Sequence, residues 1–317
     1  MKIKKIMKLM GKILLGLVSL VVVILVVLAV TNQVLLKKEA SEIKNYGEKI
    51  AIFDGEMNVL TAGSGEETIV LLPGYGTPSP GLDFKPLINE LKKDYKVVVI
   101  EPFGYGLSSQ TKRKRTLENV DEEIHEVMKK LKINSFIMMG HSISGIYGMN
   151  YVNTYPNDVK AFIGIDTSVP NQPWPGNPTL TIDFLRYSGV LRLFTQLRPE
   201  LFLMPHLTEE ENKQYLMLNL KNTGNQAMRA EGIELDKSFE KIKDKNFPQK
   251  LPLLLFIDHG NAENVSTWRK LHLKQVAHAE NGQSFELKGG HYLHRTKSKR
   301  IVKEVNAFLN ESKITTN

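Results

Sequence analysis

Ser142 is the residue whose surroundings best suit a nucleophile. Apolar residues 136–139 precede Gly140-His141-Ser142-Ile143-Ser144-Gly145, and apolar residues at helical spacing follow through residue 152. A short apolar run predicts a buried strand, and the change of spacing predicts a helix directly after it. A serine at such a bend has a strained backbone and needs small residues two positions before and after it. Gly140 and Ser144 meet that need.

This segment resembles the Gly-x-Ser-x-Gly nucleophile elbow of the α/β-hydrolase superfamily, with Ser144 in place of the last glycine. The resemblance covers residues 50 to 310 apart from one inserted segment. It implies an α/β-hydrolase fold, in which helices flank a mostly parallel sheet and Ser142 is the nucleophile. An ordinary Gly/Ser turn between two elements is the alternative for the pentapeptide by itself.

The expected general base is His291. Lys288-Gly289-Gly290-His291 is similar to the Gly-x-Gly-His segment of the same superfamily. The resemblance implies that His291 approaches Ser142 from a loop at the end of the last strand. The chain order of serine, acid and histidine is also that of the superfamily, and it differs from the order in the two common serine protease folds.

Three carboxylates compete for the place of the triad acid. Gly260-Asn261-Ala262-Glu263 is similar to the family's Gly-x-x-Asp, with Glu for Asp, so Glu263 is the first choice. Asp258, at the tip of the strand expected before this loop, is a second candidate. Asp166 is a third, because some family members carry the acid after the preceding strand.

Two backbone N–H groups are expected to stabilise an oxyanion. Pro73-Gly74-Tyr75-Gly76-Thr77 follows the expected strand 68–72 and resembles the family's oxyanion loop. The resemblance assigns the donors to the backbone of Tyr75 and of Ile143, the residue after the nucleophile. A Pro-Gly turn that only ends a strand is the alternative.

The composition argues against metal chemistry and requires no cofactor. The chain has no cysteine, so it has neither disulfides nor thiolate ligands. It has eight histidines, but no His-Glu-x-x-His or other paired-His motif stands on an expected helix. We therefore expect no metal and no cofactor.

The elements that must position these residues alternate along the chain. Residues 49–63 predict an antiparallel edge hairpin, and strands and helices then alternate from 68 to 166, as in a parallel sheet with crossover helices. Residues 171–250 contain helical patterns without a clear central strand. The expected hydrolase core therefore comprises 47–170 and 251–312, and 171–250 form a helical cap.

The N-terminus predicts a membrane anchor. Residues 13–30 are apolar except for Ser19, and 18 residues are close to the length that crosses a bilayer as a helix. A cleaved signal peptide, the alternative, usually has a shorter apolar core. Five lysines in residues 1–12 favour a cytoplasmic tail, which puts the polar stalk 31–46 and the catalytic part on the extracytoplasmic side of the cell membrane.

The positive charge does not indicate a nucleic-acid partner. The formal net charge is +8, and the five N-terminal lysines account for most of it. The other basic cluster, Lys112-Arg113-Lys114-Arg115, is expected to be a solvated loop. The expected partners are a small acyl substrate and the membrane at 13–30.

These patterns predict a single-pass serine hydrolase that cleaves an ester, thioester or small amide through an acyl-enzyme on Ser142. Two alternatives stay open. One is a hydrolase-like binding or signalling protein without turnover. The other is an aminopeptidase, which would need cap carboxylates such as Glu209, Glu210 and Glu211 to hold a substrate amine. The sequence does not indicate acyl specificity or oligomeric state.

Overall fold

An eight-stranded sheet forms the centre of the protein. The computed structural model describes residues 2–174 and 176–314. The strand order is β1-β2-β4-β3-β5-β6-β7-β8; β2 is antiparallel to both of its neighbours, and all other pairs from β4 to β8 are parallel. The strands are β1 (Glu48–Ile52), β2 (Gly55–Ala62), β3 (Thr68–Leu72), β4 (Lys96–Glu101), β5 (Phe136–His141), β6 (Val159–Ile165), β7 (Leu253–Asp258) and β8 (Gly282–Leu287).

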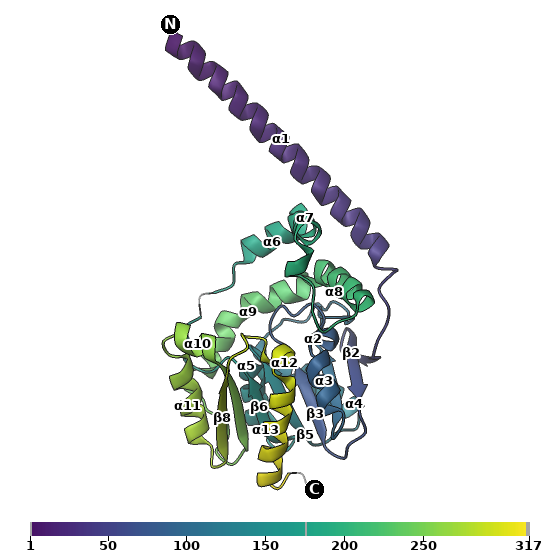
Figure 1. Ribbon diagram of the computed structural model, residues 1–317, viewed down its shortest axis with the longest axis vertical. Helices are drawn as coiled ribbons and strands as arrows, with labels where there is room; N and C mark the ends of the chain where they lie inside the picture. The colour runs from purple at the N-terminus through teal and green to yellow at the C-terminus, as the bar shows by residue number, and fades with distance from the viewer. Residues whose placement is uncertain (1, 175, 315–317) are drawn as a thin grey trace.

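Helices cover both faces of this sheet, which confirms the expected α/β-hydrolase fold (Figure 1). Strands β3, β5 and β7 are buried along their whole length, as their continuous apolar sequences require. Successive residues of β3 enter opposite cores: Val70 packs in one, Leu71 in the other. The helices around the sheet are α2 (Pro80–Asp83), α3 (Lys85–Leu91), α4 (Leu117–Lys130), α5 (Ser144–Thr154), α10 (His259–Asn264), α11 (Trp268–His278), α12 (Leu293–Thr296) and α13 (Ser298–Glu311).

A helical segment lies between β6 and β7. It contains α6 (Thr179–Ser188), α7 (Val190–Leu197), the 3₁₀ turn η1 (Pro199–Leu201), α8 (Glu209–Asn222) and α9 (Gln226–Ile242). Figure 1 shows α8 and α9 over one end of the sheet and α6 and α7 farther out, beside the N-terminal helix. We call this segment, residues 171–250, the cap.

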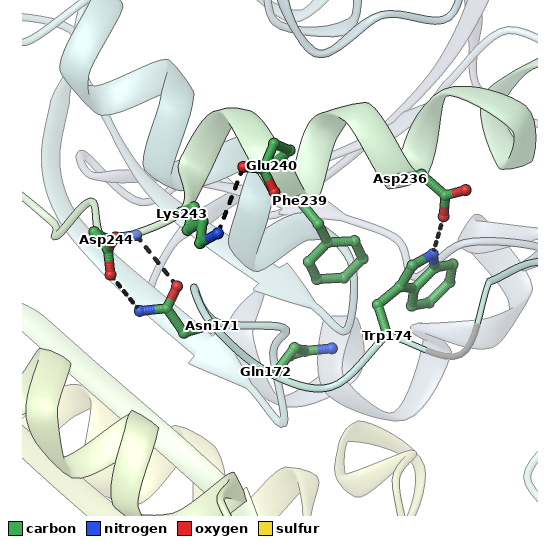
Figure 2. Close-up of a pocket in the computed structure, with 8 residues that line it drawn as sticks. All are labelled: Asn171, Gln172, Trp174, Asp236, Phe239, Glu240, Lys243 and Asp244. Atoms are coloured by element: carbon green, nitrogen blue, oxygen red, sulfur yellow. Dashed lines mark hydrogen bonds and ion pairs between the residues drawn. The ribbon is translucent and has the colours of Figure 1, made fainter.

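The cap joins the core at a pair of left-handed residues. Asn171, where the chain leaves the core, has φ +64°, and Asp244, near its return, has φ +59°. Asn171 Nδ2 donates to Asp244 Oδ1 at 2.7 Å, and the Asp244 N–H donates to Asn171 Oδ1 at 3.3 Å. Trp174 stacks on Phe239 of α9 beside them, and a cavity of about 520 Å³ opens between the two segments (Figure 2). None of the candidate site residues lines this cavity.

Arg115 corrects the expectation of a solvated basic loop. Its side chain is fully buried, and Nη1 donates to both carboxylate oxygens of Glu123 at 2.7 and 2.6 Å. Arg113 of the same loop pairs with Glu122 at 2.5 Å. Both arginines therefore pair with carboxylates in the middle of α4.

The N-terminal helix is longer than the sequence predicts. α1 (Lys2–Glu39) is continuous through residues 2–12 of the expected tail and through the first nine residues of the expected stalk. Its segment Ile3–Glu39 has an apolar window with a mean hydropathy of 3.4, none of it buried in the protein. The helix thus has the length and composition of a membrane anchor or a signal sequence.

The last turns of α1 dock on the cap. Arg192 of α7 is buried and donates from Nε to Asn32 Oδ1 at 2.8 Å, and from Nη1 and Nη2 to the two oxygens of Glu39 at 2.6 and 2.7 Å. Asn32, also buried, donates to the Arg186 carbonyl at 3.3 Å. A bidentate arginine–carboxylate pair has a specific geometry, so it fixes the end of α1 against the cap.

We expect Arg192→Ala to release the end of α1. The substitution leaves the Glu39 carboxylate unpaired in a largely buried place, a loss that costs about 3–5 kcal/mol for buried pairs and less here, because Glu39 is partly exposed. Tryptic cleavage after Lys37 or Lys38 should become several-fold faster. Arg198→Ala, which removes an exposed pair with Glu200, is the matched control. Equal cleavage of both variants would contradict the docking.

Candidate active site

Ser142 lies at a sharp bend between β5 and α5. Its φ is +54°, a left-handed conformation that is uncommon for a residue with a side chain. A Cβ on Gly140 would lie 2.9 Å from the Cβ of Ser144, so the residue two before the serine has to be glycine. The bend is held by the Ser168 N–H, which donates to the Ser142 carbonyl at 2.7 Å. Ser142 is thus held in a strained conformation at the carboxyl end of a central strand.

His291 is within hydrogen-bond distance of this serine. Ser142 Oγ and His291 Nε2 are 2.9 Å apart. His291 stands on the loop between β8 and α12, and the preceding Gly290 has φ +76°. The Gly290 N–H donates to Asp258 Oδ1 at 2.9 Å, so Asp258 holds the loop that carries the histidine.

Asp166 completes the hydrogen-bonded chain. His291 Nδ1 lies 2.6 Å from Asp166 Oδ2, which also accepts a hydrogen bond from Asn261 Nδ2 at 2.5 Å. Asp166 Oδ1 accepts from the Asp258 N–H and from Trp268 Nε1, each at 2.9 Å. Burial alone would raise the pKa of Asp166, but the contact with His291 and these donors lower it below its usual value. Asp166 is therefore ionised at neutral pH.

This geometry corrects the first choice of acid. Glu263, on the exposed side of α10, pairs with His259 Nε2 at 2.8 Å and does not contact His291. Asp258, the second candidate, supports the backbone of Gly290 and Asn261 instead of the imidazole. Of the three carboxylates, the structure brings only Asp166 to His291.

Strand register explains why Asp166 reaches the imidazole. β6 is paired directly with β5, with Gly140 opposite Gly164 and His141 opposite Ile165. The residues that follow these pairs, Ser142 and Asp166, therefore leave the same edge of the sheet side by side. Asn261 and Trp268, which hold Asp166, carry no motif that would have singled them out in the sequence.

The two expected oxyanion donors border the serine. Ile143 is the residue before the first turn of α5, and a Cβ on Gly74 would lie 3.1 Å from the Cβ of Ser142. The loop that carries Tyr75 is thus packed against Ser142. Within residues 2–174 and 176–314, no hydrogen bond is seen from the backbone N–H of Tyr75 or of Ile143. Both donors are free to meet a developing negative charge.

Ser144, the departure from the family motif, has its own structural role. Its buried hydroxyl donates to the carbonyl of Pro73 at 2.6 Å. This bond ties the elbow to the loop that carries Tyr75. A glycine at this position would leave the Pro73 carbonyl without its donor.

We expect Ser144→Ala to destabilise the fold by about 1–3 kcal/mol, because it leaves a buried carbonyl unsatisfied. It should also lower the rate of any acyl transfer, since the loop that carries one oxyanion donor loses a tie to the elbow. Chemical denaturation of the purified full chain measures the first effect. Ser64→Ala, at an exposed serine in the loop between β2 and β3, is the control. A stability change no larger than the control's would contradict the tie.

A buried cluster of His141, His294 and Asp83 contacts the backbone of His291. His141 donates from Nε2 to the His291 carbonyl at 3.0 Å, and its ring packs 4.6 Å from that of His294. Burial, with the neighbouring His294 and His291, keeps the pKa of His141 well below its usual value, so it is neutral. His294 Nε2 lies 2.7 Å from Asp83 Oδ2, and Arg295 Nε donates to Asp83 Oδ1 at 2.7 Å. The hydrogen bond from His141 therefore joins the backbone of His291 to this buried cluster.

Asp83 gives the fold a defined acid dependence. Burial would raise its pKa, but His294 and Arg295 lower it from 3.8 to about 2. Because the folded-state pKa lies below the unfolded one, the stabilisation is complete above pH 4 and is lost as the pH falls through 2; it amounts to about 2 kcal/mol. We expect the difference in unfolding free energy between wild type and Asp83→Asn to shrink by this amount between pH 4.5 and 2. A constant difference would contradict the assignment.

The cap contacts the oxyanion loop through polar groups. Tyr75 Oη of the loop donates to the Met228 carbonyl of α9 at 3.0 Å and accepts from Asn177 Nδ2 at 2.8 Å. Glu231 of α9 is buried and accepts from Tyr105 Oη at 2.9 Å and from Tyr147 Oη at 2.7 Å. The position of the cap is therefore linked by hydrogen bonds to the position of the loop that carries Tyr75.

Two of the three acidic residues at the start of α8 already have partners. Glu211 closes a capping box with Thr208 at the start of α8 and pairs with Lys85, and Glu210 pairs with Lys44. Glu209, the third acidic residue, lies in the same first turn. In the part of the chain that the structure describes, no group of three or more histidine, aspartate or glutamate side chains is arranged to hold a metal ion.

Comparison with known proteins agrees with this architecture. Residues 67–222 match the family described as alpha/beta hydrolase fold. The chain is 27% identical to the uncharacterized protein YbdG of Bacillus subtilis over 316 residues, which cover 95% of this chain and 97% of that protein. It is 33% identical to the Karrikin insensitive 2 receptor CA of Petunia hybrida over 104 residues, 32% of this chain and only 38% of the receptor. The enol-lactonase of Burkholderia xenovorans superposes with a TM-score of 0.61 at 20% identity, covering 83% of this chain and 100% of the lactonase.

The protein therefore has the α/β-hydrolase fold, and the family match together with its structural neighbours supports a place in the α/β-hydrolase superfamily. The family match in turn supports a hydrolase. The N-terminal apolar helix is an addition to that fold.

Proposed function

We propose that this protein is a membrane-anchored serine hydrolase that cleaves a carboxylic ester, a thioester or a small amide. The observation that carries the proposal is the chain of two short contacts, 2.9 Å from Ser142 Oγ to His291 Nε2 and 2.6 Å from His291 Nδ1 to Asp166 Oδ2. A nucleophile, a base and an oriented carboxylate in this order can perform acyl transfer without a cofactor.

In the proposed reaction, His291 Nε2 accepts the hydroxyl proton while Ser142 Oγ attacks the substrate carbonyl carbon. The backbone N–H groups of Tyr75 and Ile143 stabilise the resulting oxyanion. Asp166 keeps the proton on Nδ1 and stabilises the imidazolium. His291 then protonates the leaving group, which departs and leaves the acyl group on Ser142. Water, deprotonated by His291, attacks this ester, and its hydrolysis releases the acid and restores the serine.

The anchor in this proposal is α1, which crosses the cell membrane once with the catalytic part outside. Two observations support retention of the helix over cleavage. The apolar segment is longer than the core of a typical signal peptide. The polar contacts of Asn32 and Glu39 with Arg192 also join the end of the helix to the cap, a role that a removed leader would not fill.

Probe labelling tests the activity. The full-length protein in membranes is incubated with a fluorophosphonate, which phosphonylates activated serines, and the labelled peptide is identified by mass spectrometry. We expect the label on Ser142, and not on the neighbouring Ser144 or Ser168. Protease accessibility on whole cells tests the topology separately, because extracytoplasmic placement predicts digestion without lysis.

A second candidate is a binding protein that has the hydrolase site without turnover. The partial similarity to a protein named as a receptor favours it. A site that binds but does not turn over would leave Ser142 unlabelled and would hydrolyse no member of an ester library.

A further inference from the structure

An apolar face on the outer part of the cap has no partner in the described protein. It consists of side chains from α6, α7 and η1 that are 50–84% exposed: Leu180, Phe184, Tyr187, Phe194, Leu197 and Leu201. The residues of α6 are spaced by four and three, so they lie on one side of that helix. Phe194 and Leu197 are spaced by three on α7, and Leu201 belongs to the 3₁₀ turn that follows. We call this set the outer cap face. Large apolar side chains exposed together on neighbouring elements mark a candidate interaction site.

The position of α1 identifies what this face meets. The turn between α6 and α7 is at Gly189, and a Cβ there would lie 2.4 Å from the carbonyl of Leu28. Leu28 belongs to the apolar run 13–30, two residues from its end. At 1.5 Å per residue, the turn sits within about 3 Å of the level at which that run ends. Any bilayer that surrounds residues 13–30 therefore extends to the α6–α7 turn.

The chemistry of the outer cap face agrees with this depth. Two aromatic residues, Phe184 and Tyr187, are half exposed on α6, a helix that packs against α1. Aromatic rings of this kind are common in the membrane interface. Helices that lie in the membrane interface have one apolar side and one polar side, as α6 and α7 do here. The buried side of α7 carries Arg192, which holds α1, so the apolar side is left for lipid.

We infer that the outer cap face lies in the membrane interface beside α1, and that the protein contacts the bilayer at two places rather than one. The partner of this surface is the lipid of the same membrane that holds the anchor. The inference rests on the anchoring part of the proposed function and not on its catalytic part. It places the cap, and not the core sheet, at the lipid surface.

Site-directed spin labelling tests this inference cleanly, because the chain has no native cysteine. Single cysteines are introduced by Phe184→Cys and Leu197→Cys on the outer cap face and by Val22→Cys in α1. Leu273→Cys, an exposed apolar position on α11 away from the cap, is the matched control. The labelled full-length proteins are reconstituted in vesicles of phosphatidylcholine and phosphatidylglycerol. Collision rates with oxygen, which concentrates in lipid, and with a water-soluble nickel chelate are then measured.

We expect labels at 184 and 197 to show a ratio of oxygen to nickel collisions several-fold higher than at 273 but below that at 22, which lies near the middle of the apolar run. If 184 and 197 match 273 while 22 remains in lipid, the outer cap face is not in the membrane and the inference fails. Distance-dependent broadening between labels at 197 would show that a second copy covers the face, which also overturns it. A water-accessible label at 22 would refute the anchor itself, and the inference with it, while leaving the fluorophosphonate result untouched.

Discussion

Ser142→Ala is expected to lower kcat/KM for short p-nitrophenyl esters by roughly 10⁴- to 10⁶-fold, as in other triads that lose the nucleophile. The methyl group cannot attack the carbonyl, and only the oxyanion donors and substrate binding would remain. The bend itself should persist, because its hydrogen bonds come from the backbone of Ser142 and Ser168. Esterase assays of the full chain in detergent, with thermal unfolding alongside, measure both effects.

Ser168→Ala is the matched control for this substitution. Ser168 is buried next to the elbow, but its backbone N–H makes the contact with Ser142. We expect this variant to keep its activity within a few-fold and to keep its fluorophosphonate label. Hydrolysis that continues unchanged in Ser142→Ala would remove the proposed nucleophile.

Asp166→Asn is expected to cost about 10⁴-fold in kcat at neutral pH, the loss known for the equivalent change in a serine triad. An amide at this position can donate a hydrogen bond to Nδ1, which would place the proton on Nε2 and take away the acceptor for the serine hydroxyl. It also removes the negative charge that stabilises the imidazolium. A pH–rate profile of the variant measures the loss.

Glu263→Gln provides the comparison that separates the two acids. Glu263 contacts His259 on the outer side of α10, so its loss should change kcat by less than about two-fold, as expected for a surface change remote from the site. Equal losses in both variants would mean that α10 approaches His291 during turnover. A loss confined to Glu263→Gln would reverse the assignment and restore the sequence-based choice.

The proposed active site and the proposed membrane contacts both involve the cap. α9 holds the side chain of Tyr75, whose backbone is a proposed oxyanion donor, and α7 holds the end of α1. Disturbance of the anchor can therefore reach the oxyanion loop through one folded unit. Activity of the Arg192→Ala variant, measured alongside its proteolysis, would show how strongly the two are coupled.

The sequence by itself determined the fold and the local setting of Ser142. Apolar runs of strand length, alternating with helical patterns, can be buried only in a parallel sheet covered on both faces. Gly140 and Ser144 around Ser142, and Gly290 before His291, are local signals because the backbone at these points tolerates few other residues. The apolar run at 13–30 is similarly local, since its length alone makes it a candidate for a membrane span.

Only the tertiary structure decided which carboxylate meets the imidazole. Glu263, Asp258 and Asp166 each stand after a strand, and the sequence contains no information on their distances from His291. The register of β6 on β5 places Asp166 beside Ser142, and Asn261 and Trp268 from later elements hold it there. The docking of α1 on Arg192 could likewise not be predicted from the sequence, because it joins residues about 160 positions apart. Such contacts depend on how whole elements pack, and local sequence patterns do not record that packing.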